Sequence, residues 1–480
     1  MKPAQQLNIE VEKEQKPKKK FELPHIYVIL FMMMAFMATL TYIIPAGQFD
    51  RVEAPIEGRT IIDPDTFKII ESNPIGLFDF MNAIPKGLVQ SADIIFFVFA
   101  AGGAFAVLMK TGIVEIGVDK LARKFKDNSI LLIPILMVVF GVLSTFAGLP
   151  ELSLVYVPII LPLMLSLGYD SLTAVAIALI ATCAGFTSSI TNPMVGISQT
   201  IAELPAFSGA GYRAIIFVVT LTVGIYFVMK YANKVKRSPT LSLVHKEDSE
   251  KRKKAKEMLK EPLKATKRQM YASVAAAIFL GFLVYGILQL GWYMIEIAGL
   301  FISLAIVVGL IAGLKITDIC DEFNEGCKAV FLGAFIIGVA RAIVILMEEG
   351  QIMDTIVHAL EQVLGSMPDS VTVLGMFVGN TLLNFLIPSG SGQALVTIPI
   401  MAPLADILGI TRQTAVIAFH LGDGLSNVFY PTVGYFMATL AIAGVPWTKW
   451  VRFFLPLGAA WIIISVILLL VAQAINLGPY

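Results

Sequence analysis

NFLIPSGSGQALVTIP, residues 384–399, interrupts a very apolar part of the chain. Two prolines, two glycines, two serines and a glutamine stand where a membrane helix would otherwise continue. Proline removes a backbone donor and glycine loosens a helix, so the segment predicts a break. Backbone that leaves a helix at membrane depth must be buried in protein or line a wet cavity. The segment therefore predicts a break in a helix inside a membrane protein, at a place that is buried in protein or lines a wet cavity.

The composition predicts an all-α, polytopic membrane protein. Of the 480 residues, 57% are hydrophobic and 15% are charged. Apolar runs of about 20 residues recur along the chain, and each is long enough to cross a bilayer. The first run, 26–45, follows a long polar lead and lacks a small-residue cleavage site, so we expect an uncleaved first span.

Charge segregation predicts the orientation. Residues 1–24 carry six Lys and four Glu, and residues 230–268 carry fourteen Lys or Arg against five Asp or Glu. Residues 46–88 carry seven acidic residues against four basic ones. The positive-inside rule then makes the tail 1–24 and the loop 232–268 cytoplasmic and 46–88 external. Because the basic loop lies between spans, we expect it to set topology and contact anionic lipid, with no nucleic-acid partner.

The chain contains an internal duplication. ELSLVYVPIILPLMLSLGYDSLTAVAIA, from Glu151, aligns with GQALVTIPIMAPLADILGITRQTAVIAF, from Gly392. At one offset of 241, prolines, a glycine and a Thr-Ala-Val triplet coincide: Pro158 with Pro399, Pro162 with Pro403, Gly168 with Gly409, and 173–175 with 414–416. The repeat cores cover roughly 87–205 and 325–443.

Tracing the spans from the cytoplasmic tail gives the two repeats opposite orientations. The first half covers 26–231 with a re-entrant helical hairpin at 129–166, and the second covers 269–480 with a hairpin at 368–407. Each repeat also has a broken helix, at 185–193 and 420–431. Inverted repeats with broken helices are the plan of secondary transporters.

Polar side chains gather at the four breaks and predict the substrate and ion site. Hydroxyl, amide and carboxylate oxygens with free backbone ends can hold Na⁺, a carboxylate or an amine. A sodium site is a candidate near Asn192, Ser391, Asp423 and Asn427. The candidate binding residues are Glu151, Thr187, Ser188, Ser189, Thr191, Asn192, Ser389, Gly390, Ser391, Gln393, His420, Asp423, Ser426 and Asn427.

Each candidate also has a structural interpretation. Serine and threonine in membrane helices often bond to a backbone carbonyl or join helices, and His420 could be a packed histidine. Arg341 could bind, snorkel or pair with an acid. Intramembrane acids, here Glu151 and Asp423, are functional by default. No Lys or Arg lies within a break, so the acids favour a cation: Na⁺, H⁺ or the amine of an amino acid.

Other function classes fit the sequence poorly. An intramembrane aspartyl protease would need a glycine where His420 stands, and a rhomboid-type motif fails at Pro388. No Walker motif is present, so transport would be secondary. The cysteine spacing matches no common zinc or redox pattern. We therefore expect no enzyme and no cofactor beyond a coupling Na⁺ or H⁺, and re-entrant hairpins favour a carrier over a channel.

Two long motifs carry a resemblance to a known family. NFLIPSGSGQALVTIPIMAPLADILGITRQTAVIAFHLGDGLSN and GYDSLTAVAIALIATCAGFTSSITNPMVGISQTIAELP resemble the YfcC branch of the DcuC-like C4-dicarboxylate anaerobic carriers. The match extends from about residue 24 over nearly the whole chain. The family is similar to the divalent anion/sodium symporters.

The resemblance implies a homodimeric elevator carrier of a small solute in the bacterial plasma membrane. Hairpins and broken helices would slide against a scaffold domain. Members of the branch are linked to basic amino-acid exchange, such as arginine for ornithine, and the alternative is a Na⁺- or H⁺-coupled C4-dicarboxylate carrier. The Ser-Asn-Thr tip motifs of the symporters are replaced here by 148–151 and 389–391.

Overall fold

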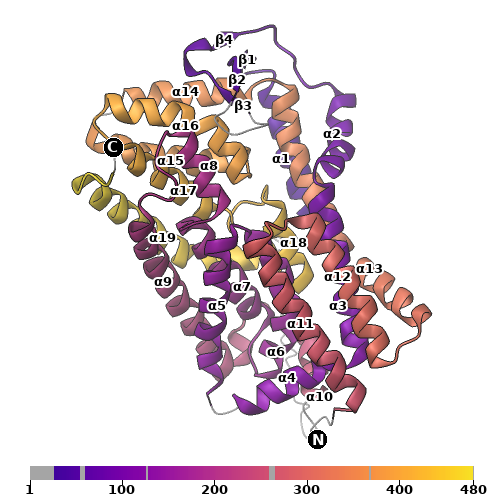
Figure 1. Ribbon diagram of the computed structural model, residues 1–480. Helices are drawn as coiled ribbons and strands as arrows, with labels where there is room; N and C mark the ends of the chain where they lie inside the picture. Colours follow the sequence, from indigo (N-terminus) through magenta and orange to yellow (C-terminus); the bar gives the residue numbers. More distant parts are fainter. Residues whose placement is uncertain (1–25, 54–59, 126–127, 259–264, 367–368, 479–480) are drawn as a thin grey trace, which may run out of the picture.

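The computed structural model describes residues 26–53, 60–125, 128–258, 265–366 and 369–478, so the predicted cytoplasmic tail 1–24 lies outside the described residues. The described chain is mainly helical (Figure 1). Within it, eight helices are long and apolar enough to cross a membrane. They have the length that a bilayer core of about 30 Å requires. The coarse prediction of a helical, multi-pass membrane protein is confirmed.

The helices follow one another in two halves. Those of the first half are α1 (Ile26–Leu40), α2 (Leu77–Gln90), α3 (Ala92–Thr111), α4 (Ile113–Lys124), α5 (Leu132–Ala147), α6 (Ser153–Ser166), α7 (Ser171–Ser188), α8 (Pro193–Ile201) and α9 (Ala210–Arg237). α10 (Ser249–Met258) lies in the basic loop between the halves. Those of the second half are α11 (Lys267–Gln289), α12 (Met294–Ala312), α13 (Ile316–Glu349), α14 (Met353–Gly365), α15 (Asp369–Leu386), α16 (Gly390–Ile407), α17 (Arg412–Ser426), α18 (Gly434–Ala443) and α19 (Trp447–Ala474). Single 3₁₀ turns lie at Pro64–Thr66, Ser129–Leu131, Pro150–Leu152 and Pro239–Leu241.

Four short strands depart from a purely helical fold. They are β1 (Gly47–Gln48), β2 (Arg51–Glu53), β3 (Thr60–Ile62) and β4 (Lys68–Ile69), paired antiparallel as β1–β4 and β2–β3. The Asp354 carboxylate on α14 holds this segment by accepting from the Phe49 backbone N–H at 3.0 Å and from Arg51 Nη2 at 2.9 Å. The strands form because a helix some 300 residues away supplies their anchor.

The two helical hairpins pack alike. α5 and α6 both lie against α7, and α15 and α16 both lie against α17. Their tips are short segments outside the α-helices, the first of which contains the 3₁₀ turn Pro150–Leu152. Gly148 ends α5 with a left-handed φ of 67° that suits glycine. In Figure 1, α6 lies toward the end of the molecule with α10, and α15 and α16 lie toward the end with the strands.

Glycines let each broken helix approach its hairpin closely. A Cβ on Gly185 of α7 would lie 2.3 Å from the Gly141 carbonyl oxygen of α5. A Cβ on Gly422 of α17 would lie 2.7 Å from the Phe377 carbonyl oxygen of α15. Backbone carbonyls cannot move aside cheaply in a packed interior, so both contacts require a residue without a side chain.

Gly185→Ala and Gly422→Ala should each lower stability by about 1–3 kcal/mol, the usual cost of overpacking. Thermal unfolding in detergent, followed by tryptophan fluorescence, measures the effect as a lower Tm. Gly281→Ala on α11 is the matched control, because its Cβ would meet no atom within 4 Å. Unchanged Tm values for both core variants would show that the helices separate more easily than the packing implies.

α13 is longer than its apolar run at 329–347. The helix begins at Ile316 and runs to Glu349. Its first turns are polar. There the Glu322 carboxylate forms an ion pair with Lys110, which lies at the end of α3, at a distance of 2.7 Å. The helix extends because its polar part packs along α3, a contact that hydropathy does not reveal. Arg341, within this helix, bonds Gln90 Oε1 at 2.9 Å and lies 3.5 Å from Glu348, which matches its structural interpretation.

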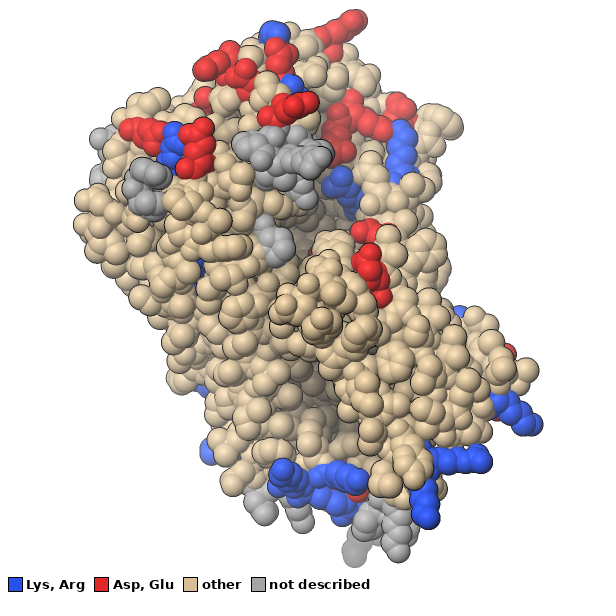
Figure 2. Space-filling model, viewed as in Figure 1, with Lys and Arg blue, Asp and Glu red and all other residues tan. Residues whose placement is uncertain are grey.

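Charges lie at opposite ends of the molecule. On the face shown in Figure 2, most acidic side chains surround the strands and α14, and most basic ones lie at the opposite end. This arrangement agrees with the segregation seen in the sequence. The cytoplasmic position of the basic end stays a prediction.

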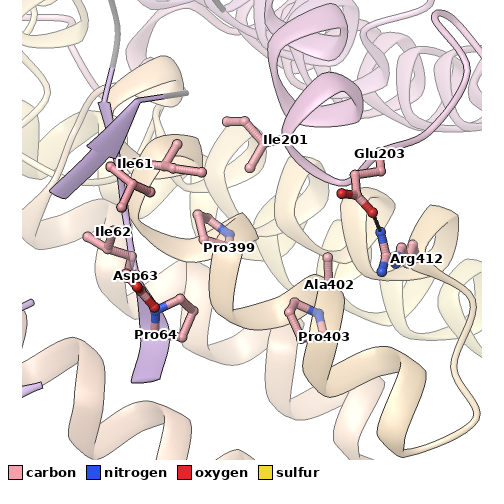
Figure 3. Close-up of a pocket in the computed structure, with 11 residues that line it drawn as sticks. Ile61, Ile62, Asp63, Pro64, Ile201, Glu203, Pro399, Ala402, Pro403 and Arg412 are labelled. Carbon is pink, nitrogen blue, oxygen red and sulfur yellow. Dashed lines mark hydrogen bonds and ion pairs between the residues drawn. The ribbon is translucent and has the colours of Figure 1, made fainter. Parts of the chain in front are cut away.

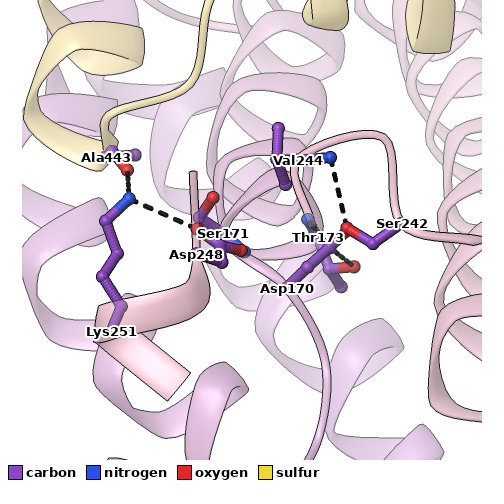
Figure 4. Close-up of polar contacts among 8 residues, drawn as sticks. All are labelled: Asp170, Ser171, Thr173, Ser242, Val244, Asp248, Lys251 and Ala443. Atoms are coloured by element: carbon purple, nitrogen blue, oxygen red, sulfur yellow. Dashed lines mark hydrogen bonds and ion pairs between the residues drawn. The ribbon is translucent and has the colours of Figure 1, made fainter. Parts of the chain in front are cut away.

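A hydrogen-bonded network ties both broken helices to the basic end (Figure 4). Asp248 Oδ2 accepts from the Ser171 N–H at the start of α7 at 2.7 Å. Lys251 donates to the Ala443 carbonyl at the end of α18 at 2.6 Å. α7 therefore begins, and α18 ends, beside the same segment of the chain. Asp170 completes the network by accepting from Thr173, Tyr231 and Ser242.

Candidate functional site

The break between α7 and α8 is held by local caps. Ser189 ends α7 with a left-handed φ of 42°, and its hydroxyl bonds the Phe186 carbonyl. Asn192 begins α8 by accepting from the Val195 N–H at 3.1 Å, and it also donates to Ser189 Oγ at 3.0 Å. Asparagine is among the best N-cap residues, so this sequence starts a new helix after the break.

Asn384 holds the break between α17 and α18. From α15, its Nδ2 donates to the Asp423 carbonyl at 3.0 Å, to Ser426 Oγ at 2.7 Å and to Asn427 Oδ1 at 3.1 Å. Asn384 is the first residue of the stretch NFLIPSGSG, and sequence reasoning did not select it. Its signal was an amide within a mainly apolar helix, the type of residue that joins membrane helices.

Each hairpin tip lies on a break of its own half. A Cβ on Gly148 would lie 2.9 Å from Asn192 Cβ, and one on Gly390 would lie 3.1 Å from Asp423 Oδ2. The two breaks also meet each other. Cys183 Sγ donates to the Gly424 carbonyl at 3.2 Å, and a Cβ on Gly424 would lie 2.2 Å from Thr187 Oγ1. The tips and breaks thus form one region in the middle of the molecule.

Unpartnered polar atoms concentrate in this region. Both oxygens of Asp423, both ring nitrogens of His420 and Glu151 Oε2 are buried without a hydrogen bond to a described residue. Other such atoms here are Asn384 Oδ1, Gln393 Oε1, Thr432 Oγ1, the Tyr435 hydroxyl, and Nε and Nη2 of Arg213. Buried polar groups are normally bonded, so these atoms retain the capacity to bind a ligand or ion.

Several predicted residues instead have internal partners. Ser188 Oγ donates to the Gly185 carbonyl at 2.9 Å, and Ser426 Oγ donates to the Gly422 carbonyl at 2.6 Å. Ser389 caps α16 by accepting from the Gly392 N–H. These bonds match the structural interpretation of serine in membrane helices. Thr191 is exposed at the first break, and Gln393 Nε2 donates to Asn380.

The predicted sodium ligands differ in whether their oxygens already accept a hydrogen bond. Asn192 Oδ1 and Asn427 Oδ1 already accept hydrogen bonds, and Ser391 lies beside Gly390 at the second tip. Asp423 keeps both carboxylate oxygens, and Asn427 approaches them without a bond of normal geometry. No group of three His, Cys, Asp or Glu suited to a metal occurs in the described chain. A sodium site here would therefore depend on Asp423, hydroxyls and carbonyls, and it stays a prediction.

Two residues beyond the predicted set join the region. The Tyr435 hydroxyl on α18 is buried without a hydrogen-bond partner among the described residues, within electrostatic reach of Glu151 and Asp423. Arg213 of α9 donates to the Ser189 carbonyl at 3.3 Å. The breaks contain no basic residue, as the sequence shows, but the fold brings one to the first break from α9, whose sequence is that of an ordinary span.

A separate pocket lies on the outer surface (Figure 3). Its volume is about 240 Å³, and the β2–β3 ladder, the end of α8 and α16 line it. On one side of the pocket, Arg412 forms ion pairs with Glu203 at 2.6 Å and with Asp406 at 2.7 Å. None of the predicted binding residues lines this pocket, so we place the candidate site at the breaks and not here.

Comparison with known proteins identifies the relatives. The model of the DcuC family, described as C4-dicarboxylate anaerobic carrier, matches residues 23–474. A protein of Escherichia coli strain K12 named "Putative basic amino acid antiporter YfcC" is 32% identical, over 92% of this chain and 94% of its own length. An uncharacterized protein of Haemophilus influenzae is 28% identical, over 95% and 98%.

A solved structure also aligns with the chain. Neisseria gonorrhoeae MtrF, reported as illuminating a class of antimetabolite efflux pumps, has a TM-score of 0.42 at 17% identity, over 95% of this chain and 96% of that one. The family match covers nearly the whole chain, and its members are transporters rather than enzymes. The chain therefore belongs to the DcuC family of membrane carriers.

Proposed function

We propose that this protein is an elevator-type secondary transporter of amino acids, including basic ones, working by ion-coupled symport or exchange. The solute would be held between the hairpin tips and the two breaks. The observation that carries the proposal is the placement of Asp423, whose two carboxylate oxygens are buried and unpartnered beneath the tip at Gly390. An ammonium group or a cation is the natural partner for such a carboxylate.

The contacts between the halves support an inverted repeat. α7 begins at the basic end and α18 ends there, so the corresponding broken helices run in opposite directions. α6 packs on α18, and α16 packs on α8. Cys183 and Gly424, which bond each other, are separated by 241 residues, the offset of the duplication. Contacts between equivalent positions are expected next to a pseudo-two-fold axis.

The helices divide into two candidate bodies for elevator motion. α2, α3, α12 and α13 pack on one another and would form the scaffold. The hairpins with α7, α8, α17 and α18 would form the moving part. By the resemblance to related carriers, we further propose a homodimer in the bacterial plasma membrane, with its N-terminus cytoplasmic and lipid around its apolar faces.

A C4-dicarboxylate is the second candidate solute. The description of the family favours it, whereas the name of the E. coli relative favours a basic amino acid. The acids at the site disfavour a dianion, because each carboxylate would repel one of its ends unless cations were bound with it. Amino-acid transport is therefore the better-supported function.

Uptake by proteoliposomes distinguishes an amino acid from a C4-dicarboxylate as the transported solute. We expect labelled arginine to accumulate when an imposed Na⁺ or H⁺ gradient, or internal ornithine, drives it. Labelled succinate should stay at the level of protein-free vesicles. Succinate uptake without arginine uptake would refute the amino-acid function and support a dicarboxylate carrier.

A further inference from the structure

Arg213 is a buried arginine with a free edge. It lies in the first turn of α9, its side chain is 1% exposed, and Nη1 donates to the Ser189 carbonyl. Nε and Nη2 are buried and have no hydrogen-bond partner among the described residues. These two nitrogens form one side of the planar guanidinium, and two parallel N–H groups of this kind match the two oxygens of a carboxylate.

Its charge has no acidic partner in the described part of the chain. None of the ion pairs found there includes Arg213. An unpaired buried charge carries a large desolvation cost. Arg412 shows the usual solution, because it is paired with Asp406 and Glu203. An anion that arrives with the solute would give Arg213 the same compensation.

Arg213 lies at the level of the breaks. Tyr231 of α9 bonds Asp170 just before α7 begins, and α7 and α9 pack along each other. From Tyr231 to Arg213 is 18 residues of helix, and from Asp170 to Ser188 is also 18, roughly 27 Å in each case. The guanidinium therefore reaches the end of α7, where it bonds Ser189.

His420 links this position to the acids. The Arg213 charge acts on the His420 ring, whose two nitrogens are buried and unpartnered. His420 precedes Asp423 by three residues on α17, so the two lie on neighbouring positions of one helical face. The region thus contains free donors, on Arg213, and free carboxylate oxygens, on Asp423 and Glu151.

We propose that Arg213 binds the carboxylate of the transported solute through Nε and Nη2. This inference rests on the proposed function and narrows its substrate class to solutes that carry both a carboxylate and an amine. A diamine would leave Arg213 uncompensated, and a dicarboxylate would place its second carboxylate against the acids. An amino acid matches the free groups at both ends.

The test compares arginine with two analogues that lack the carboxylate, argininamide and agmatine. Their inhibition of labelled arginine uptake and their stabilisation of the purified protein against heat are measured together. Wild-type protein should bind arginine at least roughly tenfold more tightly than either analogue, because a hydrogen-bonded charge pair is lost in each. Arg213→Gln should bind arginine and argininamide about equally, and Arg213→Lys, which keeps the charge, should retain part of the preference.

Arg412→Gln is the matched control, because it makes the same substitution at an arginine whose charge is already paired. It should keep the wild-type preference. Equal binding of argininamide and arginine by wild-type protein, or an unchanged preference in a folded Arg213→Gln, would overturn the proposal. Stabilisation by succinate but not by arginine, lost in Arg213→Gln, would refute amino-acid transport while supporting the carboxylate site on Arg213.

Discussion

Asp423→Asn is expected to reduce solute uptake by roughly 100-fold while the protein still folds. The substitution keeps the shape of the side chain and removes only its charge. A carboxylate in a membrane interior costs about 3 kcal/mol, and a bound cation or ammonium must recover at least that amount to bind well. Because neither oxygen of Asp423 bonds another described residue, no structural bond is lost with the charge.

Asp170→Asn is the matched control. Asp170 is equally buried, but its oxygens accept from the Thr173 N–H and hydroxyl, the Tyr231 hydroxyl and Ser242 Oγ (Figure 4). Its loss should lower stability by about 1–3 kcal/mol, the cost of leaving buried groups unsatisfied. Transport per folded molecule should change little, because this network lies at the basic end and away from the tips.

The two variants are compared by proteoliposome uptake, normalised to reconstituted protein, and by thermal unfolding in detergent. We expect Asp423→Asn to lose uptake at a Tm near or above that of the wild type, and Asp170→Asn to show the opposite pattern. Wild-type uptake by Asp423→Asn would remove this residue from the site and with it the main support for a cationic group on the solute.

The sequence can indicate where helices end because helix ends depend on local chemistry. Prolines and glycines disfavour a helix wherever they occur, and the duplication doubles that signal. α5 with α6, and α15 with α16, occupy the segments proposed as hairpins, and α7 and α17 end within the segments proposed as breaks. The roles proposed for the polar residues there remain predictions.

What the sequence misses depends on contacts between distant segments. Arg213 follows a polar loop at the start of an ordinary span, and only the packing of α9 on α7 brings it to Ser189. Asn384 and Tyr435 lie in mainly apolar helices, and no periodicity reveals the direction in which their side chains point. The strands escape prediction because two- and three-residue ladders lack a pattern, and their anchor at Asp354 lies elsewhere in the chain.

Glu151→Gln is expected to lower uptake to a similar extent, roughly 100-fold, if the first tip supplies a second charge to the site. Glu151 as a residue is half-buried, but its Oε2 is buried and unpartnered, and the Tyr435 hydroxyl lies within electrostatic reach of both this acid and Asp423. Glu151→Asp keeps the charge on a shorter side chain, so it should retain part of the activity. The uptake rates of Glu151→Gln and Glu151→Asp are compared with that of the wild type.

The double variant Glu151→Gln, Asp423→Asn separates a shared site from two independent ones. Two acids that bind one ligand should not lose activity additively, because the second loss removes an interaction that the first has already disabled. The double variant should therefore be about as inactive as either single variant. Losses that multiply would place the acids in separate steps, with Glu151 acting at the first tip and Asp423 at the second break.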